Sequence, residues 1–491
     1  MSHDPANRPG PADAEAATAT EEHDRSEPDP AAPASGVEPT EATEKAAGRW
    51  SRFFEFDDLP DQAIDEHWAD GRIVHIEYGD FECLASHLHP DPHKWSFYNV
   101  PITPLPSRAA RARPLPTSAI FVELDDGDVA LESDERMKSV VRTAAERAEH
   151  ALLLRLNHQG APVALGDDRE HFAERCEEAW GRPVVANTRK AKDEGSLLAR
   201  TLRLIRDRDG FDAQPTDSSK VNLFGFPKRF RDEELAPLLS RLGLTINAAI
   251  APEIEVKAIE RIPQAGLNVV CMPTNPGRDV LAELRRLPRP WVEVALPYGP
   301  RATRRCFEQI IEAAAGEADI AAIWRERWDP LDDRWEDLLD RSDGKRLAFV
   351  VTEENSHALT NLSRLGLPIV SLVAELGFGV DVLCEAGHIH QLERDLAALP
   401  GTLDASVLPF ANRDELEALL CHGESRAVYS DFGLDRRISR AGKGHFSRRN
   451  FEMGLYGALR TLESLVAVCE LPFYARYGRH LMPRAKRGQH D

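Results

Sequence analysis

Short apolar runs alternate with longer amphipathic stretches along the chain from residue 72 onward. The runs are rich in Val, Ile and Leu, and the stretches between them have the spacing of helices with one apolar face. This alternation is typical of parallel sheets covered by helices on both faces, so it predicts an α/β fold. Asn412 stands as an N-cap before the helical pattern of residues 413–420. The predicted strands are residues 72–78, 118–124, 151–156, 183–187, 220–226, 244–250, 267–273, 291–297, 346–352, 368–376, 406–411 and 426–432.

Twelve predicted strands are more than one doubly wound sheet usually contains, so the pattern predicts several sheets. Polar, turn-rich segments interrupt the pattern at residues 208–220 and 329–345. We therefore expect three Rossmann-like α/β domains, at residues 49–212, 217–335 and 345–491. Ligands of such folds bind at the carboxyl ends of the strands and between domains, so the cleft between domains is the expected site.

The first 48 residues differ in composition from the rest of the chain. They consist mainly of Pro, Ala, Glu, Asp and Thr, with eleven acidic against three basic residues. Such a segment buries too little apolar surface to offset the entropy lost on ordering. We expect residues 1–48 to be a disordered acidic tail, which either keeps the protein in solution or binds a partner.

Charge and cysteine usage exclude several classes of protein. The formal net charge of −21 at pH 7 disfavours nucleic acid as a partner. No apolar run approaches the roughly 20 residues that cross a bilayer, and the N-terminus has no signal pattern, so we expect a cytoplasmic protein without membrane insertion. The seven cysteines are never spaced C-x-x-C, which supports neither a disulfide framework nor a zinc ribbon.

Motifs for nucleotides and for hydrolysis are missing from the sequence. No G-x-G-x-x-G follows a strand, and the Gly-Lys pair within residues 438–446 lacks the upstream glycine and the Ser/Thr of a P-loop. No G-x-S-x-G or H-E-x-x-H occurs either. We therefore expect that this chain itself binds no nucleotide.

Several segments, taken in order, resemble the nitrogenase component 1 family. IEYGDFEC (76–83) is similar to the family's Gly-x-x-Gly-Cys segment after the first strand, with Gly79 kept and Glu82 in place of the second glycine. The segment 220–273 carries the strongest stretch of the resemblance, which covers nearly all of residues 70–480. The other segments that resemble the family are residues 117–141, 166–186, 290–310 and 445–465.

The resemblance implies a fold of three α/β domains around a central cleft. The family includes nitrogenase subunits, light-independent protochlorophyllide and chlorophyllide reductases, methylthio-alkane reductase and scaffolds for cofactor maturation. Membership implies a homologous partner subunit in an α2β2-type complex. It also implies a separate P-loop 4Fe-4S reductase component, which hydrolyses ATP and delivers the electrons.

The same resemblance makes Cys83 a candidate ligand of an iron-sulfur cluster at the subunit interface. Two further family cysteines are missing: none lies between residues 87 and 118, and residues 156–158 hold Leu, Asn and His at the third place. His87 and His89 could complete a mixed site, or the partner subunit could supply the other ligands. Alternatively, Cys83 is a small buried residue and the histidines lie in a solvated loop.

Cys271 lies one position short of the cysteine that holds the metallocofactor in other family members. The end of a buried parallel strand faces the ligand cleft. Neighbours in a strand face opposite ways, so the alternative is a buried structural cysteine. His445 lies about two residues away from the position of the family's second cofactor ligand. We therefore interpret it as an ordinary polar residue. Cys384, His388 and His390 have a spacing typical of metal ligands. The alternative is that they belong to an ordinary turn that binds no metal.

The sequence thus predicts a subunit of a nitrogenase-like two-component oxidoreductase, which passes electrons through an iron-sulfur cluster to a reducible substrate. Residues 224–232, 271–277 and 296–301 are expected to line the substrate or cofactor cleft. The alternative is a non-catalytic scaffold or cofactor-assembly subunit of the same fold that has lost its metal ligands. Dinitrogen, a tetrapyrrole double bond and a carbon-sulfur bond are all substrates within the family, and the sequence leaves the choice open.

Overall fold

The computed structural model describes most of residues 214–470 and short segments before them. The gaps within residues 214–470 are 251–252, 272–276, 288, 315–318, 353–358, 360–367, 400, 402 and 433–434. The described residues before 214 are 48–51, 53, 67–68, 73–79, 119–123, 153–159, 173–174, 176–178, 181, 183–186, 197–207 and 211.

The first sheet is parallel and has the strand order β3-β2-β4-β5. β2 is therefore a central strand, with β3 and β4 as its two neighbours. A separate short pair joins β1 to β8 of the following sequence, with His67 opposite Glu253. The bounds are β1 (His67–Trp68), β2 (Ile73–Gly79), β3 (Ala119–Glu123), β4 (Leu153–Gln159), β5 (Val184–Ala186) and β8 (Glu253–Ile254).

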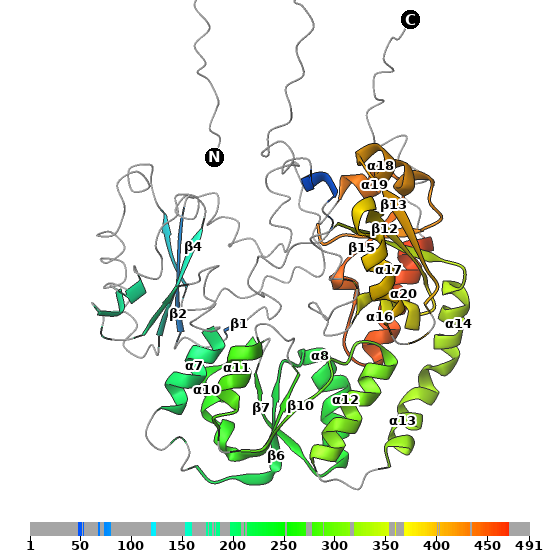
Figure 1. The fold of residues 1–491 in the computed structure, drawn as a ribbon. Helices are drawn as coiled ribbons and strands as arrows, with labels where there is room; N and C mark the ends of the chain where they lie inside the picture. The colour runs from blue at the N-terminus through cyan, green and yellow to red at the C-terminus, as the bar shows by residue number, and fades with distance from the viewer. Residues whose placement is uncertain are drawn as a thin grey trace, which may run out of the picture. The chain divides into compact units, whose positions relative to one another are not determined.

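The second sheet is also parallel, in the order β10-β9-β6-β7, and helices cover both of its faces (Figure 1). Its strands are β6 (Asp217–Phe224), β7 (Thr245–Ile250), β9 (Ala265–Val270) and β10 (Trp291–Glu293). One face packs against α7 (Leu197–Arg206), α10 (Val256–Glu260) and α11 (Gly277–Leu284). The other packs against α8 (Lys228–Phe230), the π-helical turn η3 (Arg231–Leu235), α9 (Ala236–Arg241), α12 (Gly299–Ala313) and α13 (Ile320–Trp328). We call this sheet with its helices the second module; α7 belongs to its core although it precedes the predicted boundary at 208–220.

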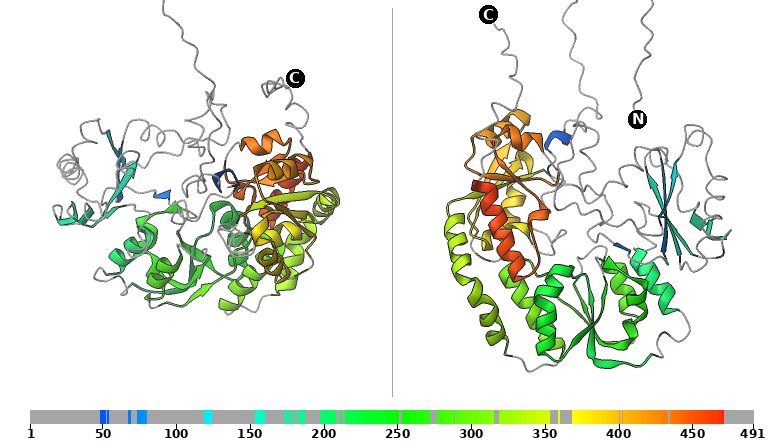
Figure 2. Two further views of the ribbon diagram at one scale, coloured as in Figure 1. Left: turned by 45° about the horizontal axis from the view of Figure 1, so that its top comes forward. Right: turned by 180° about the vertical axis from the view of Figure 1, so that it is seen from behind.

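The third sheet has five parallel strands in the order β13-β12-β11-β14-β15. We call it, with its helices, the third module, and its last helix α20 lies beside α14 (Figure 2). The strands are β11 (Arg346–Val351), β12 (Gly379–Glu385), β13 (Ala405–Phe410), β14 (Ala427–Tyr429) and β15 (Gly444–Phe446). The helices are α14 (Asp332–Ser342), α16 (Ile369–Glu375), α17 (Ile389–Ala397), α18 (Arg413–His422), α19 (Arg436–Arg440) and α20 (Leu455–Glu470).

The α/β fold with parallel sheets is confirmed, and every predicted strand but one overlaps a strand of the structure. The exception is residues 368–376, which form helix α16 instead. The buried residues of α16 have the spacing of one helical face, whereas a short apolar run alone does not separate helix from strand. The longest strand that was missed is β12, whose sequence contains a glycine and an aspartate; the short strands β1, β8 and β15 were missed as well. Asn412 caps α18 as predicted, since its Oδ1 accepts a hydrogen bond from Glu415 N at 3.0 Å.

Among the described residues, none of the helices combines the length and the apolar character needed to span a membrane.

Candidate functional site

The predicted cluster loop begins directly after strand β2, at the carboxyl edge of the first sheet. Cys83, His87 and His89 lie outside the described residues. Gly79, the last residue of β2, pairs with Glu123 of β3 and Gln159 of β4, so three parallel strands end side by side at this edge. Carboxyl edges of parallel sheets are where α/β proteins place their ligands. The segment that carries Cys83 therefore starts from an edge of the kind that binds ligands.

Strand β4 brings the position of the missing third cysteine next to β2. Asn157 pairs with Glu77, and His158 pairs with Tyr78. The resemblance placed this position near residues 156–158, and the pairing puts those residues beside the strand that leads into the cluster loop. Whether their side chains take part in the site stays a prediction.

Cys271 follows the last residue of β9 and lies in the core of the second module. Its backbone N–H donates to Phe224 O at 2.8 Å, which continues the pairing of β9 with β6. The thiol is fully buried and lies 3.9 Å from Ala295 O. Burial raises the pKa of the Cys271 thiol, and the nearby Glu293 raises it further. This environment keeps the free thiol protonated, and the role of Cys271 as a ligand stays a prediction.

The remaining cysteine and histidine candidates do not come together. Cys384 lies in β12, where burial raises the pKa of its thiol to about 11. His390 is exposed and faces Glu393 at 3.4 Å, and His445 Nε2 lies 2.8 Å from Ser430 O. Within the described part of the chain, no group of three or more His, Cys, Asp and Glu residues is placed to hold a metal ion.

The carboxyl edge of the second sheet meets the third module. Two of the three segments predicted to line the cleft, 224–232 and 296–301, lie at this junction, whereas residues 272–276 of the third lie outside the described residues. The half-buried Tyr298 packs against the cores of both modules and forms a β-bridge with Met453. Gly454 N donates to Pro297 O at 2.8 Å. These two segments are therefore in contact with the third module along the described part of the edge.

A buried carboxylate from the second module caps a helix of the third. Glu234, only 1% exposed, accepts hydrogen bonds from Leu455 N at 2.9 Å and Tyr456 N at 3.0 Å, the first amides of α20. Its own carbonyl accepts from Arg327 Nη2 at 3.0 Å. Glu234 belongs to the π-helical turn η3, and such turns are rare and frequently occur at functional sites.

A second carboxylate makes the opposite connection, from the third module to a helix of the second. Glu375, at the end of α16, accepts a hydrogen bond from Arg301 N at 2.8 Å in the first turn of α12. Its side chain is 15% exposed. Each module thus provides an acidic group to the positive end of a helix in the other.

Burial dominates the electrostatics of both carboxyl groups. It raises the pKa of Glu234 to about 7, although the two α20 amides, Arg327 and Arg460 oppose the rise. Burial also raises the pKa of Glu375, against the opposing effect of Arg301. Both carboxyl groups are therefore harder to ionise than exposed glutamates.

Neither glutamate was expected from the sequence to have a role, although the sequence contains a signal for Glu234. Phe230, Glu234 and Leu238 follow one another at intervals of four residues, and all three are buried. A charged residue within the apolar stripe of a helix is unusual, because burying a charge without partners is costly. The neighbouring acidic residues Asp232 and Glu233 obscured the signal.

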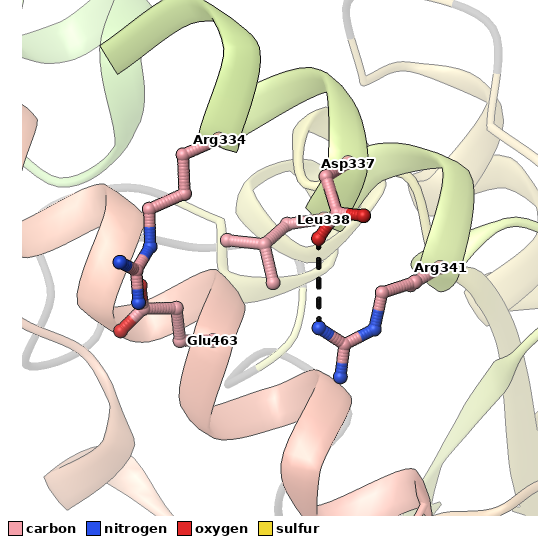
Figure 3. Close-up of a pocket in the computed structure, with 5 residues that line it drawn as sticks. All are labelled: Arg334, Asp337, Leu338, Arg341 and Glu463. Carbon is pink, nitrogen blue, oxygen red and sulfur yellow. Dashed lines mark ion pairs between the residues drawn. The ribbon is translucent and has the colours of Figure 1, made fainter. Parts of the chain in front are cut away.

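A groove between α14 and α20 is lined by charged residues (Figure 3). Arg341 pairs with Asp337 at 3.6 Å and with Glu470 at 2.6 Å, and Arg334 pairs with Glu463. The charged side chains that line the groove form ion pairs with one another or with Glu470 at its margin. We therefore assign no ligand to this groove.

Comparison with known proteins identifies the family. The profile of the nitrogenase component 1 type oxidoreductases matches residues 107–420. One subunit of the light-independent protochlorophyllide reductase of Leptolyngbya boryana is 27% identical over 197 residues, which are 36% of this chain and 38% of the relative. The same subunit from Synechococcus elongatus is 30% identical over 168 residues, or 30% of this chain and 32% of that one. This chain thus matches about a third of the length of these named relatives.

A solved structure, nitrogenase Cp1 at pH 5, superposes with a TM-score of 0.53 at 14% identity, covering 87% of this chain and 88% of that chain. At this identity the match shows the fold. Because the family profile covers more than half of the sequence, the chain belongs to the nitrogenase component 1 type oxidoreductase family. The resemblance found in the sequence and the fold class expected from it are confirmed.

Proposed function

We propose that this chain is a subunit of a nitrogenase-like two-component reductase, working as a cytoplasmic complex with a homologous partner subunit. It receives electrons from an ATP-hydrolysing 4Fe-4S reductase component. The observation that carries the proposal is the family match over residues 107–420, together with the absence of nucleotide motifs in a family of oxidoreductases. A chain without its own phosphate-binding loop fits the acceptor in such a pair.

The cluster would be held by Cys83, with His87, His89 or residues of the partner subunit as the other ligands. An iron-sulfur cluster supplies one-electron transfer, and thiolate with imidazole is an established ligand combination for it. The end of β2 at the carboxyl edge of the first sheet supports this location. For Cys271, burial of the thiol in the core of the second module supports a packing role.

The relatives named above are reductases of protochlorophyllide by name, so a conjugated tetrapyrrole double bond is the first substrate class to test. The alternative function is a scaffold that shares the fold and holds no metal. The two differ in iron content, because only the reductase role needs a cluster.

The test is anaerobic purification of the chain together with whatever binds it, followed by measurement of iron and acid-labile sulfide. We expect both in the wild type and a loss of both in Cys83→Ala. Cys421→Ser is the matched control, because Cys421 is exposed and its replacement removes a cysteine without touching the cluster loop. Cys271→Ala is expected to keep its iron. A wild-type complex without iron contradicts the reductase proposal and favours the scaffold.

A further inference from the structure

Three residues that precede the first sheet in the sequence pack into the third module. We call Trp50, Ser51 and Phe53 the N-terminal arm. Ser51 is 3% exposed, and Phe53 is completely buried in the apolar core of the third module. Trp50 is half-buried against the same core, and its carbonyl accepts a hydrogen bond from Arg437, 387 positions later in the chain. The arm is thus a separate piece of chain that docks on a module built from a distant part of the sequence.

The arm docks at the carboxyl edge of the third sheet. Phe410 is the last residue of β13, and the ring of Trp50 meets its ring edge-on, with 6.1 Å between the centroids. Asp431 follows the end of β14, and its backbone N–H donates to Phe53 O at 3.0 Å. The strands of this sheet are parallel, so β13 and β14 end at the same edge. This edge is where α/β sheets bind ligands, and the arm occupies it here.

One arginine contacts both the backbone and a ring of the arm. The guanidinium of Arg437 donates to Trp50 O, and its Cζ lies 3.7 Å from the centroid of the Phe53 ring. Asp435, whose side chain is 4% exposed, accepts from Arg437 Nε at 2.9 Å and from Ser430 Oγ at 3.0 Å. The third module therefore holds the guanidinium in position with its own residues. A planar guanidinium makes a hydrogen bond and a cation–π contact together, which an ammonium group does less well.

These contacts have the form of peptide recognition. Two main-chain oxygens of the arm, those of Trp50 and Phe53, accept hydrogen bonds from the third module. The two aromatic side chains of the same residues pack against a ring and a guanidinium of that module. When a protein binds a peptide segment, main-chain hydrogen bonds provide affinity and side-chain contacts provide specificity. The arm has both kinds of contact within four residues.

We propose that Phe410, Asp431 and Arg437 form a recognition site for aromatic segments of the pattern Trp-x-x-Phe, which the arm fills reversibly from within the same chain. While the arm is docked, this part of the carboxyl edge is closed to other ligands. When the arm leaves, the site offers a guanidinium, a backbone N–H and an aromatic ring to a second segment of the same pattern. The proposal does not depend on the proposed reductase function.

The test uses the full chain, purified with whatever binds it, and a fluorescent peptide with the sequence of residues 48–55. The double variant Trp50→Ala/Phe53→Ala empties the site. Fluorescence anisotropy should show saturable binding of the peptide to this variant, roughly 100-fold tighter than to the wild type. The difference arises because the arm of the wild type competes from within the chain, at an effective concentration of about millimolar. A peptide with alanine in place of both aromatic residues should not bind.

A substitution at Arg437 shows whether the peptide binds at this site. Arg437→Lys keeps the charge but not the planar group, so in the double variant it should weaken peptide binding roughly tenfold. Arg436→Lys, at the exposed neighbouring residue, is the matched control and should leave binding unchanged. Hydrogen exchange provides a second readout. The Asp431 amide should lose protection in the double variant and regain it with the peptide, while the Glu415 amide, bonded to Asn412, stays protected throughout.

Phe53→Leu carries the same test in a chain whose core stays filled. Leucine keeps an apolar side chain in the core but removes the ring beneath Arg437, so the peptide should bind this variant more tightly than it binds the wild type. Absence of peptide binding to both variants would overturn the proposal. So would equal binding to wild type and variants, or binding that Arg437→Lys leaves unchanged.

Discussion

Alanine at Gly454 tests how closely the second and third modules are fitted together. Gly454 has φ +94°, which costs an L-residue roughly 1–2 kcal/mol. The new Cβ would lie 2.8 Å from Glu234 Cδ and closer still to Glu234 Oε1 and Phe230 Cδ2. The carboxyl group must then move and lose its bonds to the α20 amides, which costs about 1.5–3 kcal/mol for bonds to a charged group. We expect Gly454→Ala to lower the unfolding free energy by about 2.5–5 kcal/mol.

Gly243 provides the matched control for this substitution. It also has a positive φ, +71°, but a Cβ built there meets nothing within 4 Å. Gly243→Ala should therefore cost only the backbone strain, about 1 kcal/mol. Urea unfolding followed by tryptophan fluorescence compares the two variants. Equal losses in the two, within about 0.5 kcal/mol, would refute the close approach of Glu234 to the start of α20.

Two further predictions concern buried polar groups in the second module. Burial opposes ionisation of Glu283, but hydrogen bonds from Arg203 and Arg206 outweigh it and lower its pKa. Glu283→Gln should lower the unfolding free energy by about 1–3 kcal/mol at pH 7. The difference between variant and wild type should shrink as pH falls below 4.5, because the carboxyl group then becomes protonated. Urea titrations in which the difference stays constant would contradict the pairing of Glu283 with the two arginines. Asn222 donates to Asn268 Oδ1 at 2.8 Å across two strands and to a backbone carbonyl at 2.9 Å, so Asn222→Leu should cost about 2–3 kcal/mol. A loss below about 0.5 kcal/mol in the same titration would show that these bonds contribute little.

The strands could be predicted because most of them are continuous apolar runs between turn-rich segments. β9 and β11 are buried along nearly their whole length, as expected for parallel strands covered on both faces. Residues 368–376 have a similar composition but form α16, because Pro368 precedes a run whose buried positions fall on one helical face. β12 was missed because Asp381, which bonds Arg346, interrupts its apolar pattern.

In the candidate site, too, the features that depend on neighbouring residues could be predicted, and those that depend on residues far apart in the sequence could not. The end of β2, which precedes Cys83 in the sequence, could be predicted, because the end of a strand is a local feature of the sequence. The capping of α20 by Glu234 could not, because the two lie more than 200 residues apart and only the packing of the modules brings them together. Cys271 is buried, as the register argument allowed, and its role as a cofactor ligand stays a prediction.

The most direct test of the proposed function is reduction of the purified complex by its reductase component. The complex is mixed anaerobically with that component and MgATP, and the electron paramagnetic resonance spectrum of the reduced cluster is recorded for wild type, Cys83→Ala and Cys421→Ser. We predict an ATP-dependent signal in the wild type and in Cys421→Ser, and none in Cys83→Ala. A wild-type complex that shows no cluster signal, or a Cys83→Ala complex that keeps it unchanged, would contradict the assignment of Cys83 as the cluster ligand of an electron-transfer subunit.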